Sequence, residues 1–325
     1  MAGARKRINW QPPMLRVLAA LAPLTLSGIY FFGWRTLALL LAVNAASAAA
    51  EWLFTRRSGE PVSSAVFVTA TLYTLSLPPA LPVPMAVLGA VFGVVFGKMV
   101  FGGFGRNVFN PALTGRAFVY VCFGNHLTAR WTEPYAGPLG GLAGYARLGA
   151  DALTTATPGM VLKSGGAFDL GAAFFGAAPG VIGGSAALAL LGGAYLLWTR
   201  TANFRIVLPG FLAFLAVQTA LWRAGVPKAA APLPALLSGS FILGMLFYAT
   251  DPVSAAQTNP GRWLYGALIG ALSALIAVYS AWPAGTMFAI LLANTFAPIM
   301  DYAIRAWQAR QRQPAPQPKP AAPAP

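Results

Sequence analysis

The chain has 325 residues, of which 57% are hydrophobic and only 9% are charged. Soluble globular proteins carry about 25% charged residues, so this composition excludes a soluble domain and indicates a polytopic membrane protein. The 22 basic residues against 7 acidic ones give a formal net charge of +15, which in a soluble chain suggests nucleic-acid binding. Here the basic residues lie between apolar runs, so membrane topology and anionic lipid headgroups explain them better. A lipid bilayer is therefore the expected partner, and no nucleic acid is.

The chain has a single cysteine, Cys122, and a single histidine, His126. These counts exclude an intrachain disulfide, a cysteine-ligated iron–sulfur cluster built by this chain alone and a bis-histidine haem. Any redox chemistry must use another cofactor, and no metal site is predicted.

About ten apolar runs, long enough to cross a bilayer fully or in part, predict an all-α membrane protein. We expect a cytoplasmic N-terminus without a cleaved signal peptide in residues 1–13 and a disordered Pro-rich cytoplasmic tail in residues 305–325. Residues 14–123 and 169–304 hold five spans each, and residues 124–168 form a long loop between them. The expected spans are residues 14–32, 36–54, 63–77, 84–101, 117–123, 170–198, 206–222, 233–248, 263–281 and 284–304.

Lysine and arginine residues predict the orientation. When residues 1–13 are placed inside, most basic side chains fall in the inside connections. The positive-inside rule then places residues 124–168 outside the cytoplasm.

Two short elements recur five spans apart. Asn107-Val-Phe-Asn-Pro111 recurs as Asn294-Thr-Phe-Ala-Pro298. Residues 73–78 and 247–252 are also similar, since each segment begins with an aromatic residue and ends with proline. An odd number of spans per unit requires the second unit to be inverted, as in transport folds with broken helices. The alternative is chance recurrence of proline and aromatic residues in a biased composition.

Polar residues interrupt the apolar pattern in residues 102–116 and 249–262, and Lys98 ends the fourth expected span. Intramembrane polar side chains usually serve a function. A lysine near a helix end can instead extend its charge to the membrane surface, so both interpretations of Lys98 stay open. Asp251, which precedes Pro252, can equally cap a helix end.

The loop segment Asp151-Ala-Leu-Thr-Thr-Ala-Thr157 is small and hydroxyl-rich. It resembles the signature at which bacterial flavin transferases attach FMN through its phosphate, with Thr155 where glycine is usual. The resemblance implies covalent FMN on Thr157, with Asp151, Thr154 and Ala156 as recognition residues. Attachment calls for an exposed hydroxyl on a flexible extracytoplasmic loop.

Two further stretches, residues 102–112 and 249–255, resemble the RnfD/NqrB family. This family comprises the D-type membrane protein of the Rnf electron transport complex and its B-type counterpart in the sodium-translocating NADH:quinone reductase. The resemblance runs from about residue 10 to residue 305 and implies a ten-helix inverted-repeat subunit that is not catalytic alone. It would relay electrons, coupled to Na⁺ or H⁺ movement, in a ferredoxin:NAD⁺ or NADH:quinone type of complex.

The resemblance also implies cofactors and partners. A second, non-covalent flavin, riboflavin, is expected in addition to FMN, and the partners would be the A, B, C, E and G components of an Rnf complex and a flavin transferase. The polar residues best placed to line an intramembrane flavin or ion path are Asn107, Asn110, Thr250 and Asp251. Two alternatives remain, an inverted-repeat channel or solute permease without flavin and a scaffold for an electron-transfer assembly.

Overall fold

The computed structural model describes residues 8–146, 156–280 and 285–312, and helices dominate them. Among these residues, 5 helices are long and apolar enough to cross a membrane, which makes the chain a multi-pass membrane protein. They are α1 (Pro12–Phe32), α2 (Arg35–Ser58), α10 (Phe204–Arg223), α13 (Asn259–Tyr279) and α14 (Gly285–Arg312).

Shorter elements complete the described chain. The apolar ones are α3 (Ala65–Leu75), α4 (Val83–Val94) with a π-helical turn (Val95–Met99), α5 (Pro111–Cys122), α9 (Ala186–Trp198) and α12 (Phe241–Leu243) with a second π-helical turn (Gly244–Tyr248). The connections hold α6 (Gly124–Thr128), a 3₁₀ turn (Gly140–Ala143), α7 (Pro158–Lys163), α8 (Leu170–Phe175) and α11 (Pro232–Leu237). A two-residue parallel ladder joins β1 (Ile8–Asn9) to β2 (Val62–Ser63), a small departure from the all-α expectation.

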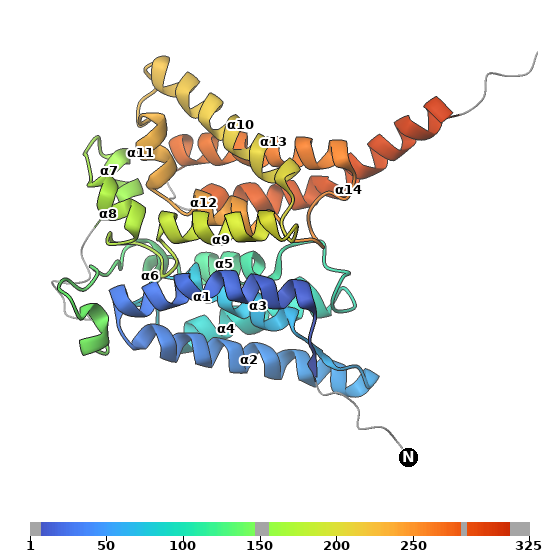
Figure 1. The fold of residues 1–325 in the computed structure, drawn as a ribbon, viewed down its shortest axis with the longest axis horizontal. Coiled ribbons are helices and arrows are strands. Elements are labelled where there is room, and N and C mark those ends of the chain that lie inside the picture. Colours follow the sequence, from blue (N-terminus) through green and yellow to red (C-terminus); the bar gives the residue numbers. More distant parts are fainter. Residues whose placement is uncertain (1–7, 147–155, 281–284, 313–325) are drawn as a thin grey trace, which may run out of the picture.

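The helices fall into two halves that lie side by side (Figure 1). One half holds α1 to α5, and the other holds α9, α10 and α12 to α14, with α1 packed against α9 between them. The short helices α6, α7, α8 and α11 gather at one end of the bundle, whereas α1 begins and α14 ends at the other (Figure 1). The fold thus separates the segment after residue 155 from both ends of the described chain.

Glycines set the closest helix packing. A Cβ on Gly270 of α13 would collide with the carbonyl oxygen of Gly210 on α10, and one on Gly115 of α5 would collide with the carbonyl oxygen of Gly89 on α4. Small residues at such crossings let two backbones approach closely, as is common between membrane helices.

The outer surface carries large apolar side chains, including Leu26, Leu41, Leu191 and Ile299. So many exposed large apolar side chains are unusual on a soluble monomer and are normal where lipid or partner subunits cover the surface.

Four segments differ from the expected spans. The expected span 117–123 is only the second part of α5, which begins at Pro111 within the polar break. The run 170–198 is broken, because α8 ends at Gly176 with a φ of 90° and α9 begins only after its N-cap Ser185. The run 233–248 is interrupted between α11 and α12. Helix α14 continues to Arg312, so the first part of the expected disordered tail is helical, and the rest lies outside the described residues.

Candidate functional site

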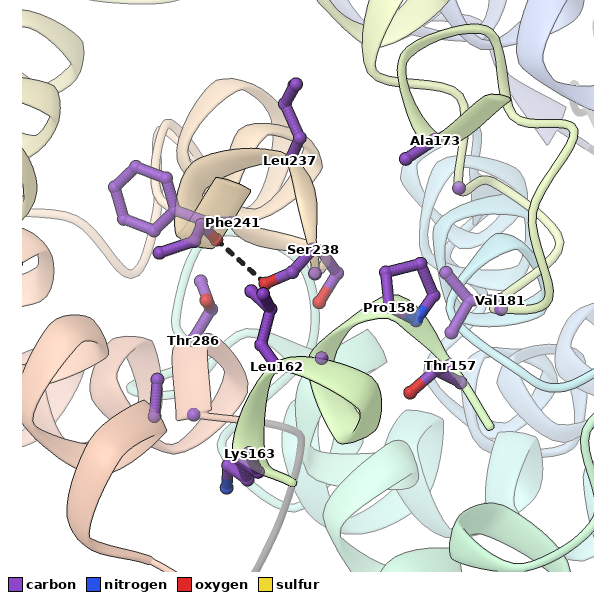
Figure 2. A pocket seen from close by; sticks show the side chains of 18 of the residues that line it. Thr157, Pro158, Leu162, Lys163, Ala173, Val181, Leu237, Ser238, Phe241 and Thr286 are labelled. Atoms are coloured by element: carbon purple, nitrogen blue, oxygen red, sulfur yellow. Dashed lines mark hydrogen bonds between the residues drawn. The ribbon is translucent and has the colours of Figure 1, made fainter. Parts of the chain in front are cut away.

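Thr157 is the N-cap residue of α7. Its Oγ1 accepts a hydrogen bond from the backbone N–H of Met160 at 3.4 Å, and its carbonyl accepts from the same N–H at 2.9 Å. Pro158 follows at the first helical position, where its fixed φ and missing N–H are tolerated. Figure 2 shows Thr157 and Pro158 beside Val181, with Lys163 at the far end of the short helix.

The Thr157 side chain is buried, which differs from the exposed hydroxyl expected from the sequence. Only 7% of Thr157 is accessible, and Figure 2 shows it beside Val181 at the start of α7. Ala156 is exposed, while Asp151, Thr154 and Thr155 lie outside the described residues. Any enzyme that modifies Thr157 must therefore act on a conformation in which the start of α7 has moved away from the bundle.

Thr157 borders a cavity of about 140 Å³ that we call the Thr157 cavity. It lies at the end of the bundle where α6, α7, α8 and α11 gather. Its lining comes from α5 to α8 and from α10 to α14, and Figure 2 shows Phe241 and Thr286 on the side opposite Thr157 and Val181. Apolar side chains make up much of the wall: Leu127, Trp131, Leu162, Val181, Phe214, Leu237 and Phe241.

Three side chains that line the Thr157 cavity have a buried polar atom without a hydrogen-bond partner. The atoms are Nε of Arg116, Oε1 of Gln218 and Oγ of Ser273, from α5, α10 and α13. A buried polar group left unpaired costs about 1–3 kcal/mol. Such groups in a native fold point to a water, ion or ligand that is not part of the chain.

Lys163 and Lys228 add positive charge to the wall of the Thr157 cavity. Lys163 Nζ donates a hydrogen bond to the carbonyl of Ser280 at 2.9 Å. Partial burial, together with the nearby charge of Lys228, lowers the pKa of Lys163. An anionic phosphate between them would relieve this repulsion and form charge-assisted hydrogen bonds.

The residues present therefore fit a phosphate-linked FMN in two respects and oppose it in one. Lys163 and Lys228 suit the phosphate, and the unpaired atoms of Arg116, Gln218 and Ser273 suit a polar ring edge. The buried Thr157 hydroxyl resists attachment while α7 is docked.

A larger cavity, of about 510 Å³, opens at the other end of the bundle; we call it the Asp251 cavity. Its lining includes all four residues singled out from the two polar breaks, Asn107, Asn110, Thr250 and Asp251, together with Lys98. The structure thus brings together residues that lie more than 130 positions apart in the sequence, since Asn110 Nδ2 donates to the carbonyl of Tyr248 across a separation of 138 residues.

Local structure already uses much of the hydrogen-bonding capacity of these four residues. Asn110 caps α5 through its Oδ1, which accepts from Ala112 and Leu113. Asp251 holds its own turn by accepting from the backbone N–H of Val253 at 3.3 Å and the Ser254 hydroxyl at 2.7 Å.

The hydroxyl of Thr250 donates to the carbonyl of Leu246, and the Asn107 amide donates to that of Phe109. Their structural role is observed directly, and a role toward a ligand stays a prediction.

Lys98 does not extend to the membrane surface. Its Nζ lies 2.6 Å from Oε2 of Glu51, and the side chains of both residues are 2% exposed. The other carboxylate oxygen of Glu51 accepts from the backbone N–H of Ser63 at 2.9 Å. This is the one ion pair found within residues 8–146, 156–280 and 285–312.

The two recurring sequence elements meet near the centre of the bundle. Asn294 Oδ1 accepts from the backbone N–H of Asn110 at 3.2 Å, and its Nδ2 donates to the carbonyl of Ser254 and to Tyr265. The Tyr248 hydroxyl donates to the carbonyl of Leu72 at 2.6 Å. Segments from both halves are therefore tied together by buried hydrogen bonds.

Sequence reasoning missed Glu51, Gln218 and Ser273. Glu51 and Gln218 are rare polar residues within long apolar runs, so that contrast could have drawn attention to them. Ser273 gives no such signal, because a lone serine is common in membrane helices. No group of three or more His, Cys, Asp or Glu side chains that could hold a metal ion occurs in the part of the chain that the structure describes.

Comparison with known proteins finds a matching family over almost the whole chain. Residues 3–309 match the model of the NQR2, RnfD, RnfE family. The B subunit of the Na(+)-translocating NADH-quinone reductase of Neisseria meningitidis serogroup B is 41% identical over 273 residues, which cover 81% of this chain and 65% of that protein. The B subunit of the same enzyme from Chromohalobacter salexigens is 39% identical over 260 residues, covering 78% and 61%.

The B subunit from Pseudomonas aeruginosa strain LESB58 is 41% identical over 261 residues, covering 78% and 62%. The chain thus spans less than two thirds of the length of these relatives. With a family model that covers nearly all of its residues, the chain belongs to the NQR2, RnfD, RnfE family.

Proposed function

We propose that this chain is the membrane subunit of an ion-translocating electron transport complex and carries FMN as a phosphoester on Thr157. Family membership supports the class of complex, since relatives about 40% identical are named subunits of a Na⁺-translocating NADH-quinone reductase. The observation that carries the flavin assignment is the position of Thr157 beside a cavity with two lysines and three unpaired polar atoms.

Bound FMN would supply electron transfer, and the chain's own residues would hold and screen it. Lys163 and Lys228 stand where they can pair with the phosphate. The aromatic and aliphatic wall excludes water from the ring, and attachment to Thr157 keeps the flavin at a high effective concentration. The A, B, C, E and G components of an Rnf-type complex would donate and accept the electrons, and a flavin transferase would form the phosphoester.

The topology belongs to the same proposal. Ten spans in two inverted units, in a bacterial inner membrane, would place residues 1–13 and 305–325 in the cytoplasm and Thr157 in the periplasm. The supporting observation is that α1 begins and α14 ends at the end of the bundle opposite α7 (Figure 1). The hydrogen bonds between Asn110, Asn294 and Tyr248 agree with a repeat whose broken helices face each other.

The Asp251 cavity is proposed to hold the second flavin, riboflavin. Its volume of about 510 Å³ lies in the range of small-molecule sites, about 300–1,000 Å³. Its wall combines polar and apolar side chains. The polar ones include Asn107, Asn110, Thr250 and Asp251, and the apolar ones include Leu72, Leu196 and Phe247.

A denaturing gel viewed under ultraviolet light tests the covalent flavin. The full chain is expressed with a flavin transferase, and yellow-green fluorescence should stay with its band after denaturation. Thr157→Val should abolish the signal and Thr157→Ser should keep it. A dark band for the native chain, or a bright one for Thr157→Val, refutes the assignment. Solute flux into liposomes by flavin-free protein would instead favour a permease.

A further inference from the structure

The three unpaired polar atoms of the Thr157 cavity come from helices far apart in the sequence. Arg116 lies on α5, Gln218 on α10 and Ser273 on α13, and these residues are 6%, 2% and 1% exposed. Two of the helices belong to one half of the bundle and the third to the other half. The three side chains reach one cavity only when both halves of the bundle are folded and packed. Their arrangement is therefore a property of the tertiary structure and not of local chain geometry.

Of the three residues, Arg116 has the strongest need for a partner. It is a charged side chain inside the bundle, and no carboxylate lies within ion-pair distance of it among the described residues. An unpaired buried charge is strongly unfavourable. The Thr157 cavity is the place where a compensating negative or strongly dipolar group can lie.

Gln218 is fixed by its other amide atom. Its Nε2 donates to the carbonyl of Ala230 at 2.8 Å, which leaves Oε1 as an acceptor. Ser273 offers a hydroxyl that can donate or accept. Together with Arg116, the wall therefore presents a cationic donor, a neutral acceptor and a hydroxyl.

We propose that Arg116, Gln218 and Ser273 seat the pyrimidine edge of the flavin that Thr157 carries. This inference rests on the proposed function. The edge offers acceptors at N1, O2 and O4 and a donor at N3–H, so Arg116 pairs with N1 and O2 while Gln218 Oε1 accepts from N3–H. Ser273 donates to the remaining carbonyl.

The volume of the Thr157 cavity suits the pyrimidine edge of a flavin ring and not a whole FMN molecule. At about 140 Å³ it is smaller than a typical small-molecule site. The phosphate and the ribityl chain would stay near Thr157 and Lys163, and the ring edge would point inward. Phe214 and Phe241, whose rings stack with centroids 4.1 Å apart, supply an apolar wall beside it.

Arg116 acts on the flavin as a positioning and electrostatic residue. When a flavin takes up two electrons and one proton, the reduced ring keeps a negative charge near N1 and O2. A buried guanidinium there favours the reduced form, because electrostatic attraction is strong where water is excluded. The cavity is thereby predicted to raise the reduction potential of the Thr157 flavin.

A dithionite titration of the purified, flavin-loaded full chain tests this. Arg116→Gln removes the charge, and we expect at least a tenfold weaker preference for the reduced flavin, which is about 30 mV for a two-electron couple. Arg116→Lys should recover most of the shift. Gln218→Leu should weaken seating, seen as easier quenching of the flavin fluorescence by iodide.

Arg130→Gln is the matched control, because Arg130 is exposed and lies outside the cavity lining. It should change neither the potential nor the quenching. The fluorescent band on a denaturing gel reports attachment separately in every variant. An attached flavin whose potential and quenching match the native values in Arg116→Gln and Gln218→Leu would mean that the cavity holds ordered water only, which overturns the proposal. A native chain without covalent flavin refutes the proposed function itself.

Discussion

Removing one partner of the Lys98–Glu51 pair should destabilise the fold strongly. The two charged atoms are 2.6 Å apart, and both side chains are 2% exposed. Ala50, next to Glu51 in the chain, belongs to a buried apolar cluster with Val62, Val66 and Val94, while Lys98 also lines the Asp251 cavity. A single substitution leaves an uncompensated charge there, at a cost of about 3–5 kcal/mol.

The two single variants need not cost the same. Lys98→Met leaves the Glu51 carboxylate with the Ser63 backbone N–H as its remaining donor. Glu51→Gln keeps an oxygen for that N–H but leaves a buried ammonium. The double variant Glu51→Gln/Lys98→Met buries only neutral groups, so it should be more stable than the sum of the single effects implies, by about 2 kcal/mol.

Thermal or denaturant unfolding of the purified chain in detergent measures these differences. Arg57→Met serves as the control, because Arg57 is an exposed cation at the end of α2, and it should be nearly neutral. Single effects that sum to the double effect within about 0.5 kcal/mol would refute the reasoning, because independent sites behave that way.

Three further predictions concern packing, pH and topology. Gly270→Leu should prevent the close approach of α13 to α10, since even a Cβ collides with the Gly210 carbonyl. It should lower the melting temperature far more than the same change at Gly124, where a Cβ meets nothing within 4 Å. The lowered pKa of Lys163 means that the folded state disfavours the protonated form of this side chain. The contribution of Lys163 to the free energy of unfolding should therefore be greatest above its pKa in the unfolded chain, about 10.4, and should fall as the pH drops from there to the folded pKa. Lys163→Met should flatten this part of the curve of stability against pH. An alkaline phosphatase reporter fused within residues 135–149 should be active, and activity of a cytoplasmic-only reporter there would overturn the orientation.

Hydropathy predicted the long membrane helices well. The expected run 14–32 is α1 and the run 206–222 is α10, with ends that differ by at most two residues. A continuous apolar run hid the break between α8 and α9, because hydropathy does not register backbone geometry. The signals were present in Gly176 and Pro179, since glycine takes the positive φ that ends α8 and proline cannot continue a helix.

The candidate sites were predicted only in part. Composition and motif indicated Thr157 and the four residues of the Asp251 cavity, and the fold brings those four together. Burial of Thr157 could not be predicted, because it depends on how the start of α7 packs in the folded chain. The partner of Lys98 lies 47 residues away on α2, and only the packing of α2 against α4 brings the two together.

The buried hydroxyl gives the flavin proposal a kinetic consequence. The start of α7 must open before a transferase can reach Thr157, and it can close over the flavin afterwards. Substitutions that loosen α7 without touching the hydroxyl should therefore speed attachment. Leu162→Ala, which trims a side chain of α7 that lines the cavity, is expected to shorten the half-time of flavin incorporation in a time course with purified transferase.

Mass spectrometry of the peptide that contains Thr157 tests the central claim most directly. In chain co-expressed with the transferase, that peptide should gain the mass of FMN less one water, with fragmentation placing the added mass on Thr157. The Thr157→Val peptide should have its unmodified mass. An unmodified native peptide, or FMN on Thr154 or Thr155 instead, would contradict the assignment.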